Sequence, residues 1–214
     1  MKVCAINQVN ASVPKDESLP SYHHGDLHAA LIESALRRVE QVPYEQISLH
    51  ALATELGVSQ AAPYRHFKNK DALLVEIAKH GFAGLIASRN GRAEAAPRQK
   101  KLEAACHGYV LFALQNPGLY RLMFQSSILA QVNKSPDLEE IARESFSGLI
   151  EQVKDDGRFA DPLATALFIW SSLHGSIVIR LAAIDPTAAG NDADGKGIVD
   201  VLFQHIGKGT RAPL

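Results

Sequence analysis

The chain has 214 residues, of which 46% are hydrophobic and 21% are charged, and its formal net charge is −1. This composition excludes a wholly disordered chain, and a net charge so near zero excludes a protein that coats nucleic acid without selectivity. The two cysteines, Cys4 and Cys106, lie far apart, so they give no disulfide framework and fit a reducing compartment. No basic start followed by an apolar run marks a signal peptide, so a cytoplasmic location is expected.

Helical periodicity and turn residues divide the chain into nine helices with no convincing strand, which predicts an all-α fold. Residues 1–20 lack periodicity and contain two prolines, so they are expected to form an N-terminal arm. Residues 21–70 are expected to hold three helices, over about 25–40, after Ser48 and after Ser59. Residues 71–214 are expected to form a C-terminal domain, whose first helix, over about 70–88, is expected to be capped by Asn69. Its other helices are expected over about 98–115, 119–129, 136–154, 162–184 and 197–206.

A pair of short helices joined by a tight turn is the strongest pattern. Ser48 can cap the first helix, Gly57 ends it, and Ser59 can cap a second helix of about two turns. The second helix has little side-chain bulk at its start and an aromatic, basic cluster after it. This pattern is typical of a helix-turn-helix, whose second helix enters the DNA major groove. The alternative is a three-helix bundle that has a short middle turn.

Residues 31–77 resemble the DNA-binding domain of the tetracycline-repressor (TetR) family of bacterial transcriptional regulators, through Leu-Ile-Glu-Ser-Ala-Leu and Gly-Val-Ser-Gln-Ala-Ala-Pro-Tyr-Arg-His-Phe-Lys-Asn-Lys. The resemblance implies an all-helical dimer whose C-terminal domain binds a small molecule and then lowers the affinity for DNA. Residues 22–27, 116–124 and Trp-Ser-Ser-Leu-His-Gly at 170–175 are similar to the subgroup with a Trp…His-Gly signature.

The chain departs from the family pattern at two places. Arg38 and Val39 replace a usual Leu-Phe pair and Pro43 replaces a usual glycine, which points to different packing at the end of the first helix. Ala61 and Pro63 replace the frequent Gly and Leu of the second helix. We expect Pro63 to lie in or just after the first turn of that helix, where a missing N–H costs least.

The resemblance and the helix positions together assign DNA contacts. Gln60 and Ala61 are expected to face base edges, since glutamine pairs with adenine and an alanine methyl can touch a thymine methyl. The resemblance gives Tyr64 and His66 phosphate contacts, with Tyr64 also able to reach a base, and surface or core filling is the alternative for both. It leaves the role of His50 open, because a histidine is shorter than the base-contacting arginine often found there. The expected DNA-contacting set is Ser48, His50, Ser59, Gln60, Ala61, Ala62, Tyr64, Arg65, His66, Lys68 and Lys70.

The segment 163–184 is apolar nearly all round, so it reads as a buried helix and needs partners on two sides. A second copy of the chain is expected to be one partner, in a two-fold four-helix interface with residues 197–206. The alternative is a central helix in a large monomer. The expected dimer contacts are Leu167, Ile177, Leu181, Val201, Leu202 and His205.

Aromatic and sulfur-containing side chains of the C-terminal domain suggest a pocket for a largely apolar ligand, with simple core packing equally open for each residue. The expected ligand-binding set is His107, Phe112, Tyr120, Met123, Phe124, Trp170 and His174.

The sequence carries no pattern for an enzyme or a metal site. Neither His23-His24 with His28 nor Cys106-His107 has zinc-ligand spacing, and no phosphate loop or hydrolase motif is present. No cofactor, metal or catalytic residue is therefore expected. The expected function is a ligand-responsive transcriptional repressor that binds a palindromic operator as a homodimer. An all-α enzyme or small-molecule carrier, and a helical protein-interaction module, are the alternatives.

Overall fold

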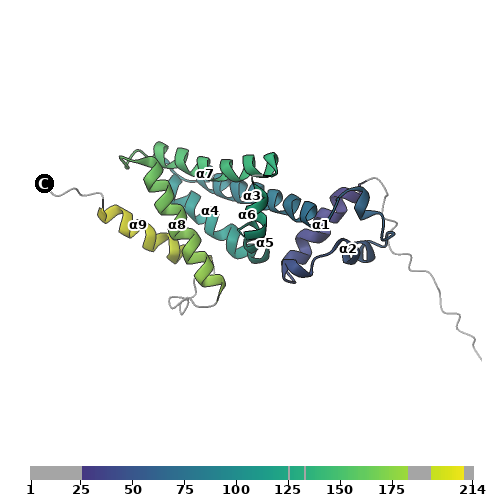
Figure 1. Ribbon diagram of the computed structural model, residues 1–214. Helices are drawn as coiled ribbons and strands as arrows, with labels where there is room; N and C mark the ends of the chain where they lie inside the picture. The colour runs from purple at the N-terminus through teal and green to yellow at the C-terminus, as the bar shows by residue number, and fades with distance from the viewer. Residues whose placement is uncertain (1–25, 125, 133, 183–193, 210–214) are drawn as a thin grey trace, which may run out of the picture.

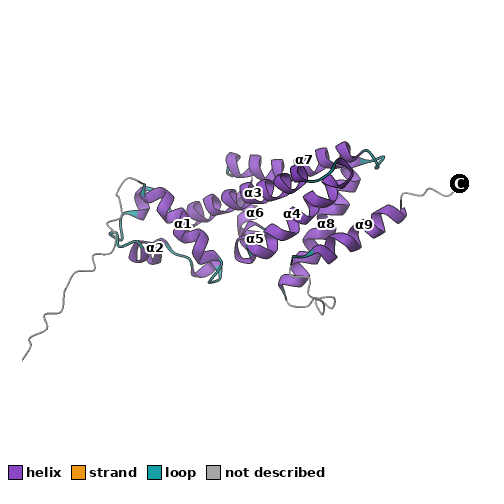
Figure 2. Ribbon diagram, turned by 180° about the vertical axis from the view of Figure 1, so that it is seen from behind, coloured by secondary structure: helices purple, strands orange, loops and turns teal. Residues whose placement is uncertain are grey.

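The computed structural model describes residues 26–124, 126–132, 134–182 and 194–209, and the predicted N-terminal arm at 1–20 lies outside these ranges. Within them the chain forms nine α-helices and no strand, so the all-α prediction is confirmed (Figures 1 and 2). The helices are α1 Leu27–Val39, α2 Leu49–Glu55, α3 Lys70–Ala95, α4 Lys101–Gln115, α5 Pro117–Met123, α6 Ser126–Val132, α7 Pro136–Asp156, α8 Pro162–Leu181 and α9 Lys196–Gly209.

The long helix α3 joins a small N-terminal domain to a larger helical domain (Figure 1). Its 26 residues span about 39 Å at the usual rise per residue. Helices α1 and α2 lie at its start, and α4 to α7 pack along the rest of it. Helices α8 and α9 pack on α4 at the far end of the molecule. A movement of the larger domain can therefore reach the smaller one along a continuous helix.

Side-chain caps fix the helix starts as the sequence predicts. Ser48 accepts from the amide of Ala51 at 3.1 Å, and Asn69 accepts from the amide of Ala72 at 2.9 Å. Each such cap stabilises its helix by about 1 kcal/mol. Gly57 ends α2 with a φ of 66°, a left-handed conformation that glycine adopts without strain.

Hydrogen bonds and an ion pair between polar side chains connect α1 to α2. The buried hydroxyl of Ser34 donates to Oε1 of Glu55 at 2.6 Å, and Arg38 lies 3.2 Å from Oε2 of the same carboxylate. The Ser34 hydrogen bond, assisted by Arg38, lowers the pKa of Glu55. The departure at Arg38 is therefore accommodated by a carboxylate of α2 that accepts hydrogen bonds from two side chains of α1.

The expected α-helix after Ser59 is wrong. Residues 59–62 form a turn in which the amide of Ala62 donates to the carbonyl of Ser59 at 2.9 Å, and residues Pro63–Arg65 form a 3₁₀ turn. The cause is Pro63, whose nitrogen would have to donate the first helical hydrogen bond to Ser59 and carries no proton. The segment is consequently more compact than a two-turn helix.

Two other helix boundaries differ from the expected ones. Helix α3 continues through Asn90 and Gly91 to Ala95, because packing against α4 and α7 overrides the weak helix propensity of those two residues. The stretch expected as one helix over 119–129 is divided into α5 and α6. Phe124 leaves the helix at this division, and its ring packs 4.6 Å from that of His174.

The two domains meet where the end of α1 touches the start of α5. The carboxylate of Glu40 accepts from the amides of Gly118 at 2.8 Å and Leu119 at 2.9 Å. A carboxylate at a helix N-terminus is favourable, since it satisfies free amides and faces the positive end of the dipole. A Cβ atom at Gly118 would overlap the backbone carbonyl of Val39, so only glycine permits this approach.

Replacing Gly118 with alanine is therefore expected to lower the free energy of unfolding by about 2 kcal/mol, because the backbone of α1 must move. Gly91 is the matched control, since a Cβ atom there meets nothing within 4 Å. Gly91→Ala should raise the free energy of unfolding by about 0.4–1 kcal/mol. Urea unfolding followed by circular dichroism measures both, and equal effects of the two substitutions would contradict the close approach at Gly118.

Candidate nucleic-acid interface and cavities of the helical domain

We call residues 59–68 the reader segment. Two of its side chains, Pro63 and Phe67, are buried and hold it against the rest of the domain. Phe67 is 4% exposed, and its ring stacks on that of His28 at a centroid distance of 4.9 Å. Most side chains around these anchors face outward, and Tyr64 is 57% exposed. The outward set consists of Ser59, Gln60, Ala61, Tyr64, Arg65, His66 and Lys68, with Ala62 partly covered.

Helix α2 contributes polar groups beside the reader segment. Nε2 of Gln60 donates to the hydroxyl of Thr54 at 3.1 Å, which donates to the backbone carbonyl of His50 at 3.1 Å. Ser48 lies at the N-terminus of the same helix, and its hydroxyl proton is available to a further acceptor while its oxygen caps the helix. The sequence analysis missed Thr54, which stands four residues after His50 and hence on the same helix face.

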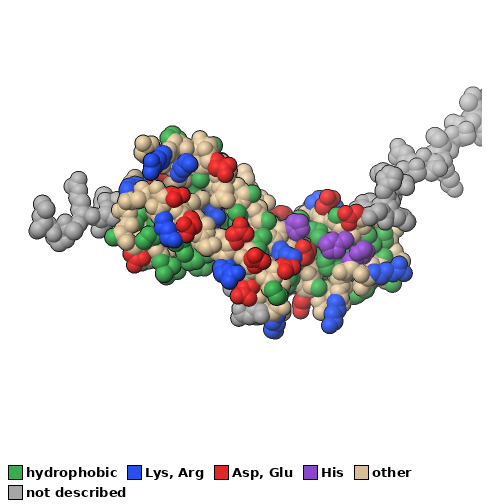
Figure 3. Space-filling view, turned by 90° about the horizontal axis from the view of Figure 1, so that it is seen from above, with side chains coloured by type: hydrophobic (Ala, Val, Ile, Leu, Met, Phe, Trp, Pro, Cys, Tyr) green, Lys and Arg blue, Asp and Glu red, His purple; other side chains and the backbone are tan. Residues whose placement is uncertain are grey.

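Positive charge is concentrated around the reader segment although the whole chain is near neutral. Arg65 and Lys68 are exposed and form no ion pair with any residue in the described ranges. Lys70 donates to the backbone carbonyl of Glu45 at 2.5 Å rather than to a carboxylate. Histidines also gather at this end of the molecule (Figure 3). Cations without carboxylate partners can pair with phosphates.

The C-terminal end of the molecule exposes an apolar face. Phe168 on α8 is 53% exposed and Val201 on α9 is 57% exposed. The face consists of Leu163, Leu167, Phe168, Val178, Ile179 and Val201. A groove of about 270 Å³ between α8 and α9 lies beside it and is lined in part by Phe168, Ser172, Val201 and His205.

The predicted dimer contacts divide into exposed and buried positions. Leu167, Val201 and His205 are exposed and Leu181 is partly buried, whereas Ile177 and Leu202 lie in the core of the protomer. Four exposed apolar residues of α8 were missed: Leu163, Phe168, Val178 and Ile179. The apolar residues surround this helix almost completely, so the sequence alone did not distinguish its inner face from its outer one.

Helix α8 is long and apolar enough to cross a membrane by length and composition, with a mean hydropathy of 1.5 in its most apolar window. In this structure 22% of that window is buried within the chain.

Five of the predicted ligand-binding residues lie together in the helical domain. The hydroxyl of Tyr120 lies 3.0 Å from that of Tyr109 and 2.7 Å from Nδ1 of His174. The ring of His174 stacks on Trp170 at 5.7 Å and meets Phe124 edge-on at 4.6 Å. Met123 is fully buried next to them. We call Tyr109, Tyr120, Phe124, Trp170 and His174 the aromatic cluster.

Burial keeps the aromatic cluster neutral. Desolvation raises the pKa of Tyr109 to about 12 and raises that of Tyr120 further, with Tyr109 contributing. Desolvation also lowers the pKa of His174. The imidazole is therefore uncharged at pH 7, and its Nδ1 can accept the hydrogen bond from Tyr120.

The other two predicted ligand-binding residues lie elsewhere. Phe112 is buried against α3, where a Cβ atom at Gly84 would stand 2.9 Å from its ring. His107 is near the surface, where its ring nitrogens lie 3.3 Å from Nη1 of Arg92 and 3.1 Å from the carbonyl of Asp194. It borders an opening of about 310 Å³ between α4 and α9.

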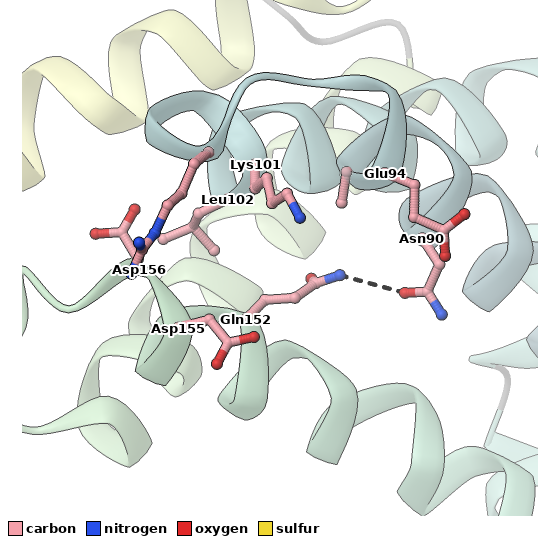
Figure 4. A pocket seen from close by; sticks show the side chains of 9 residues that line it. Asn90, Glu94, Lys101, Leu102, Gln152, Asp155 and Asp156 are labelled. Carbon is pink, nitrogen blue, oxygen red and sulfur yellow. Dashed lines mark hydrogen bonds between the residues drawn. The ribbon is translucent and has the colours of Figure 1, made fainter.

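A larger opening, of about 410 Å³, lies between α3, α4 and α7 and was not predicted (Figure 4). Its lining consists of Asn90, Ala93, Glu94, Arg98, Lys101, Leu102, Gln152, Asp155 and Asp156. Asn90 and Gln152 face each other across it, and Nε2 of Gln152 donates to Oδ1 of Asn90 at 3.2 Å. The sequence analysis missed this opening because it expected α3 to end before Asn90.

Among the described residues, no group of three or more His, Cys, Asp or Glu side chains could hold a metal ion. His23 and His24 lie outside the described ranges.

Two family models match the chain. The model for bacterial regulatory proteins of the tetR family matches residues 31–77, and the model for the tetracyclin repressor-like C-terminal domain matches residues 102–195. The chain is also similar to a solved structure of a protein of unknown function from Rhodococcus sp. RHA1. That similarity has 25% identity and a TM-score of 0.74, and it covers 89% of this chain and 98% of the other.

Curated relatives match over shorter stretches. The nucleoid occlusion factor SlmA of Colwellia psychrerythraea is 29% identical over 105 residues, which are 47% of this chain and 52% of the relative. The uncharacterized HTH-type transcriptional regulator YobS of Bacillus subtilis is 26% identical over 90 residues, which are 42% of this chain and 47% of the relative. The chain thus spans about half the length of the curated relatives it matches.

The neutral state of His174 predicts a pH dependence of stability. Its ordinary pKa is 6.5 and burial lowers the folded value, so below pH 6.5 the unfolded chain binds a proton that the folded chain does not. The free energy of unfolding should therefore fall as the pH drops from 6.5 through the folded pKa. Urea unfolding between about pH 7.5 and 5 measures it. The variant His174→Gln should show a shallower dependence, and an identical slope in both proteins would contradict the assignment.

Proposed function

This chain belongs to the tetracycline-repressor family of bacterial regulatory proteins, and we propose that it is a dimeric, cytoplasmic repressor that releases its DNA operator when a small, largely apolar effector binds. The reader segment supports the proposal, because it exposes polar and aromatic side chains beside Arg65 and Lys68, which pair with no carboxylate in the part of the chain that the structure describes. We assign residues 21–70 to DNA binding and residues 71–214 to effector binding and dimerisation. The stacked pair of Trp170 and His174 supports membership of the Trp…His-Gly subgroup.

The reader segment is proposed to dock in the major groove. Gln60, Ala61 and Tyr64 would face base edges, with Gln60 exchanging its hydrogen bond to Thr54 for an adenine. Such an exchange costs little, since one protein hydrogen bond is replaced by another. Phosphates would be met by the surrounding polar and basic side chains: Ser48, His50, Ser59, Arg65, His66, Lys68 and Lys70. Ala62, whose amide already donates to Ser59, would lie among them as an apolar contact.

The apolar face of α8 and α9 is proposed to pair with the same face of a second copy. Phe168 and Val201 expose large apolar surfaces on adjacent helices, and contiguous patches of this kind mark interaction sites. A two-fold pair would present two reader segments to half-sites about 34–36 Å apart, hence a palindromic operator. The same pairing would explain why α8 is as apolar as a membrane-spanning helix while its other side packs in a protein core.

Effector binding is proposed to act on the reader segment through two connections. Helix α3 runs directly into it, and Glu40 links α1 to the N-terminus of α5, which carries Tyr120. An effector that moves the aromatic cluster would shift α5 and α3 together. A coupling of about 1–3 kcal/mol changes DNA affinity about 5- to 150-fold.

Base contacts are tested with an operator selected from randomised duplex DNA. Gln60→Ala and Tyr64→Ala should each weaken operator binding about 5- to 150-fold, since a good base contact is worth about 1–3 kcal/mol. Lys68→Ala should weaken binding to all sequences and reduce the salt slope by about 1. Gel-shift titrations at several salt concentrations measure these effects.

Lys154→Ala is the control for charge, because Lys154 is an exposed lysine of α7 that pairs with Glu151. It should leave operator affinity and salt slope unchanged. Full operator affinity in both the Gln60 and the Tyr64 variants would overturn the proposed DNA interface.

The dimer is tested by placing charge on the apolar face. Phe168→Glu should convert the protein to monomers in analytical ultracentrifugation, because pairing of the apolar faces would then bury unpaired carboxylates. Ala95→Glu, at an exposed position at the end of α3, should remain dimeric. A wild-type protein that sediments as a monomer at all concentrations would refute dimerisation through this face.

A further inference from the structure

Arg89 is a buried cation at the centre of the helical domain. It is 3% exposed, although it lies on the long helix α3. Its Nη1 donates to the backbone carbonyl of Ser145, and its Nε donates to Oδ1 of Asn90 at 3.2 Å. It forms no ion pair with any carboxylate in the described ranges, and the exposed Glu144 acts on it only through its field.

Keeping this cation buried is costly. Removing a charged group from water costs several kcal/mol, which a carbonyl and an amide oxygen offset only in part. The desolvation lowers the pKa of Arg89, yet an arginine stays protonated in proteins. Gly148 of α7 makes room for the guanidinium, because a Cβ atom there would collide with Nη2. A glycine within a helix adds a further cost of roughly 1 kcal/mol. The arrangement therefore suits binding of an anion better than stabilisation of a core.

A small cavity adjoins the guanidinium. Its volume is about 10 Å³, close to that of a single water molecule. It is lined by Arg89, Ala105, Cys106, Tyr109, Ser145, Leu149, Trp170 and Leu173, so the surroundings of the cation are mostly apolar and aromatic.

The small cavity and the open 410 Å³ pocket of Figure 4 lie one or two turns apart along the same seam between α3, α4 and α7. Asn90 lies between them, and its Oδ1 accepts from both Arg89 and Gln152. This amide oxygen takes the place that one oxygen of a carboxylate ligand would take. The Oε1 atom of Gln152 is buried without a partner among the described residues, so a single hydrogen bond holds the Asn90–Gln152 pair.

We propose that Arg89 binds the carboxylate of an amphipathic monoanion, which enters from the open pocket and displaces the side chain of Asn90. This assignment names the effector class of the repressor proposed above and rests on that proposal. The planar guanidinium matches a carboxylate. The cavity of about 10 Å³ is too small for the body of the ligand, so a hydrocarbon or aromatic body would lie in the open pocket against Ala93 and Leu102. The lining of the pocket carries three carboxylates, of Glu94, Asp155 and Asp156, and two cations, of Arg98 and Lys101, so its own charge does not favour ligands with several negative charges.

Trp170 provides the readout, because it is the sole tryptophan of the chain and borders the cavity beside Arg89. The probes are octanoate and octan-1-ol, which share a chain and differ in charge. Titration of tryptophan fluorescence should show wild-type protein binding octanoate at least about tenfold more tightly than octan-1-ol, as expected for hydrogen bonds between charged groups. Arg89→Met should abolish this preference.

Arg92→Met is the matched control, since Arg92 lies three residues further on the same helix and is exposed. It should keep the wild-type preference. If Arg89→Met fails to fold by circular dichroism, Arg89→Lys retains the charge without the planar fork and should bind octanoate several-fold more weakly than wild type. Equal wild-type affinity for the two probes, or a preference that survives loss of the Arg89 guanidinium, overturns the assignment. These titrations contain no DNA. A negative result would therefore refute the carboxylate site at Arg89 without affecting the DNA interface, which the gel shifts test independently.

Discussion

The contact of Glu40 with the first amides of α5 is the constraint on which the arrangement of the two domains depends. One carboxylate satisfies two amides that the helix cannot satisfy itself, at 2.8 and 2.9 Å. Gly118 lets the backbones of α1 and α5 approach until no side chain would fit. The N-terminal domain is thereby held at both ends, by α3 through covalent continuity and by α5 through this cap. A shift of α5 cannot occur without moving α1 or breaking the cap.

Most of the fold could be predicted from local signals, because helix caps and breakers act within a few residues. Ser48, Asn69 and Gly57 end or begin helices where the sequence predicts. The helix predictions failed where two opposing effects act on the same residue. Pro63 was expected to be harmless early in a helix, but it stands at the position that must donate the first helical hydrogen bond. Asn90 and Gly91 resemble a break and remain helical because α4 and α7 pack along α3, where Asn90 accepts a hydrogen bond from Gln152 of α7.

The candidate sites were predicted less well than the helices, for a physical reason. The reader segment is local, so its exposed side chains follow from a dozen consecutive residues. Which residues of the helical domain are exposed depends on which helix faces pack together. Because α8 is apolar nearly all round, its sequence does not indicate which of its faces is buried. Ile177 and Leu202 were predicted to be dimer contacts and lie in the core of the protomer, while the exposed Phe168 was missed. Periodicity predicts that a helix has a buried face, and tertiary packing selects which.

Arg89 illustrates why buried charge escapes sequence analysis. Beside Asn90 and Gly91 it resembles a surface arginine near a helix end, and its burial depends on Gly148, far along the chain in α7. The aromatic cluster is the opposite case, because its residue types are conspicuous in the sequence while its hydroxyls and imidazole already satisfy one another. A satisfied, neutral network gains little from a ligand, whereas a cation held by two neutral oxygens gains a charge-assisted bond. A carboxylate ligand would therefore gain more binding free energy at Arg89 than at the aromatic cluster.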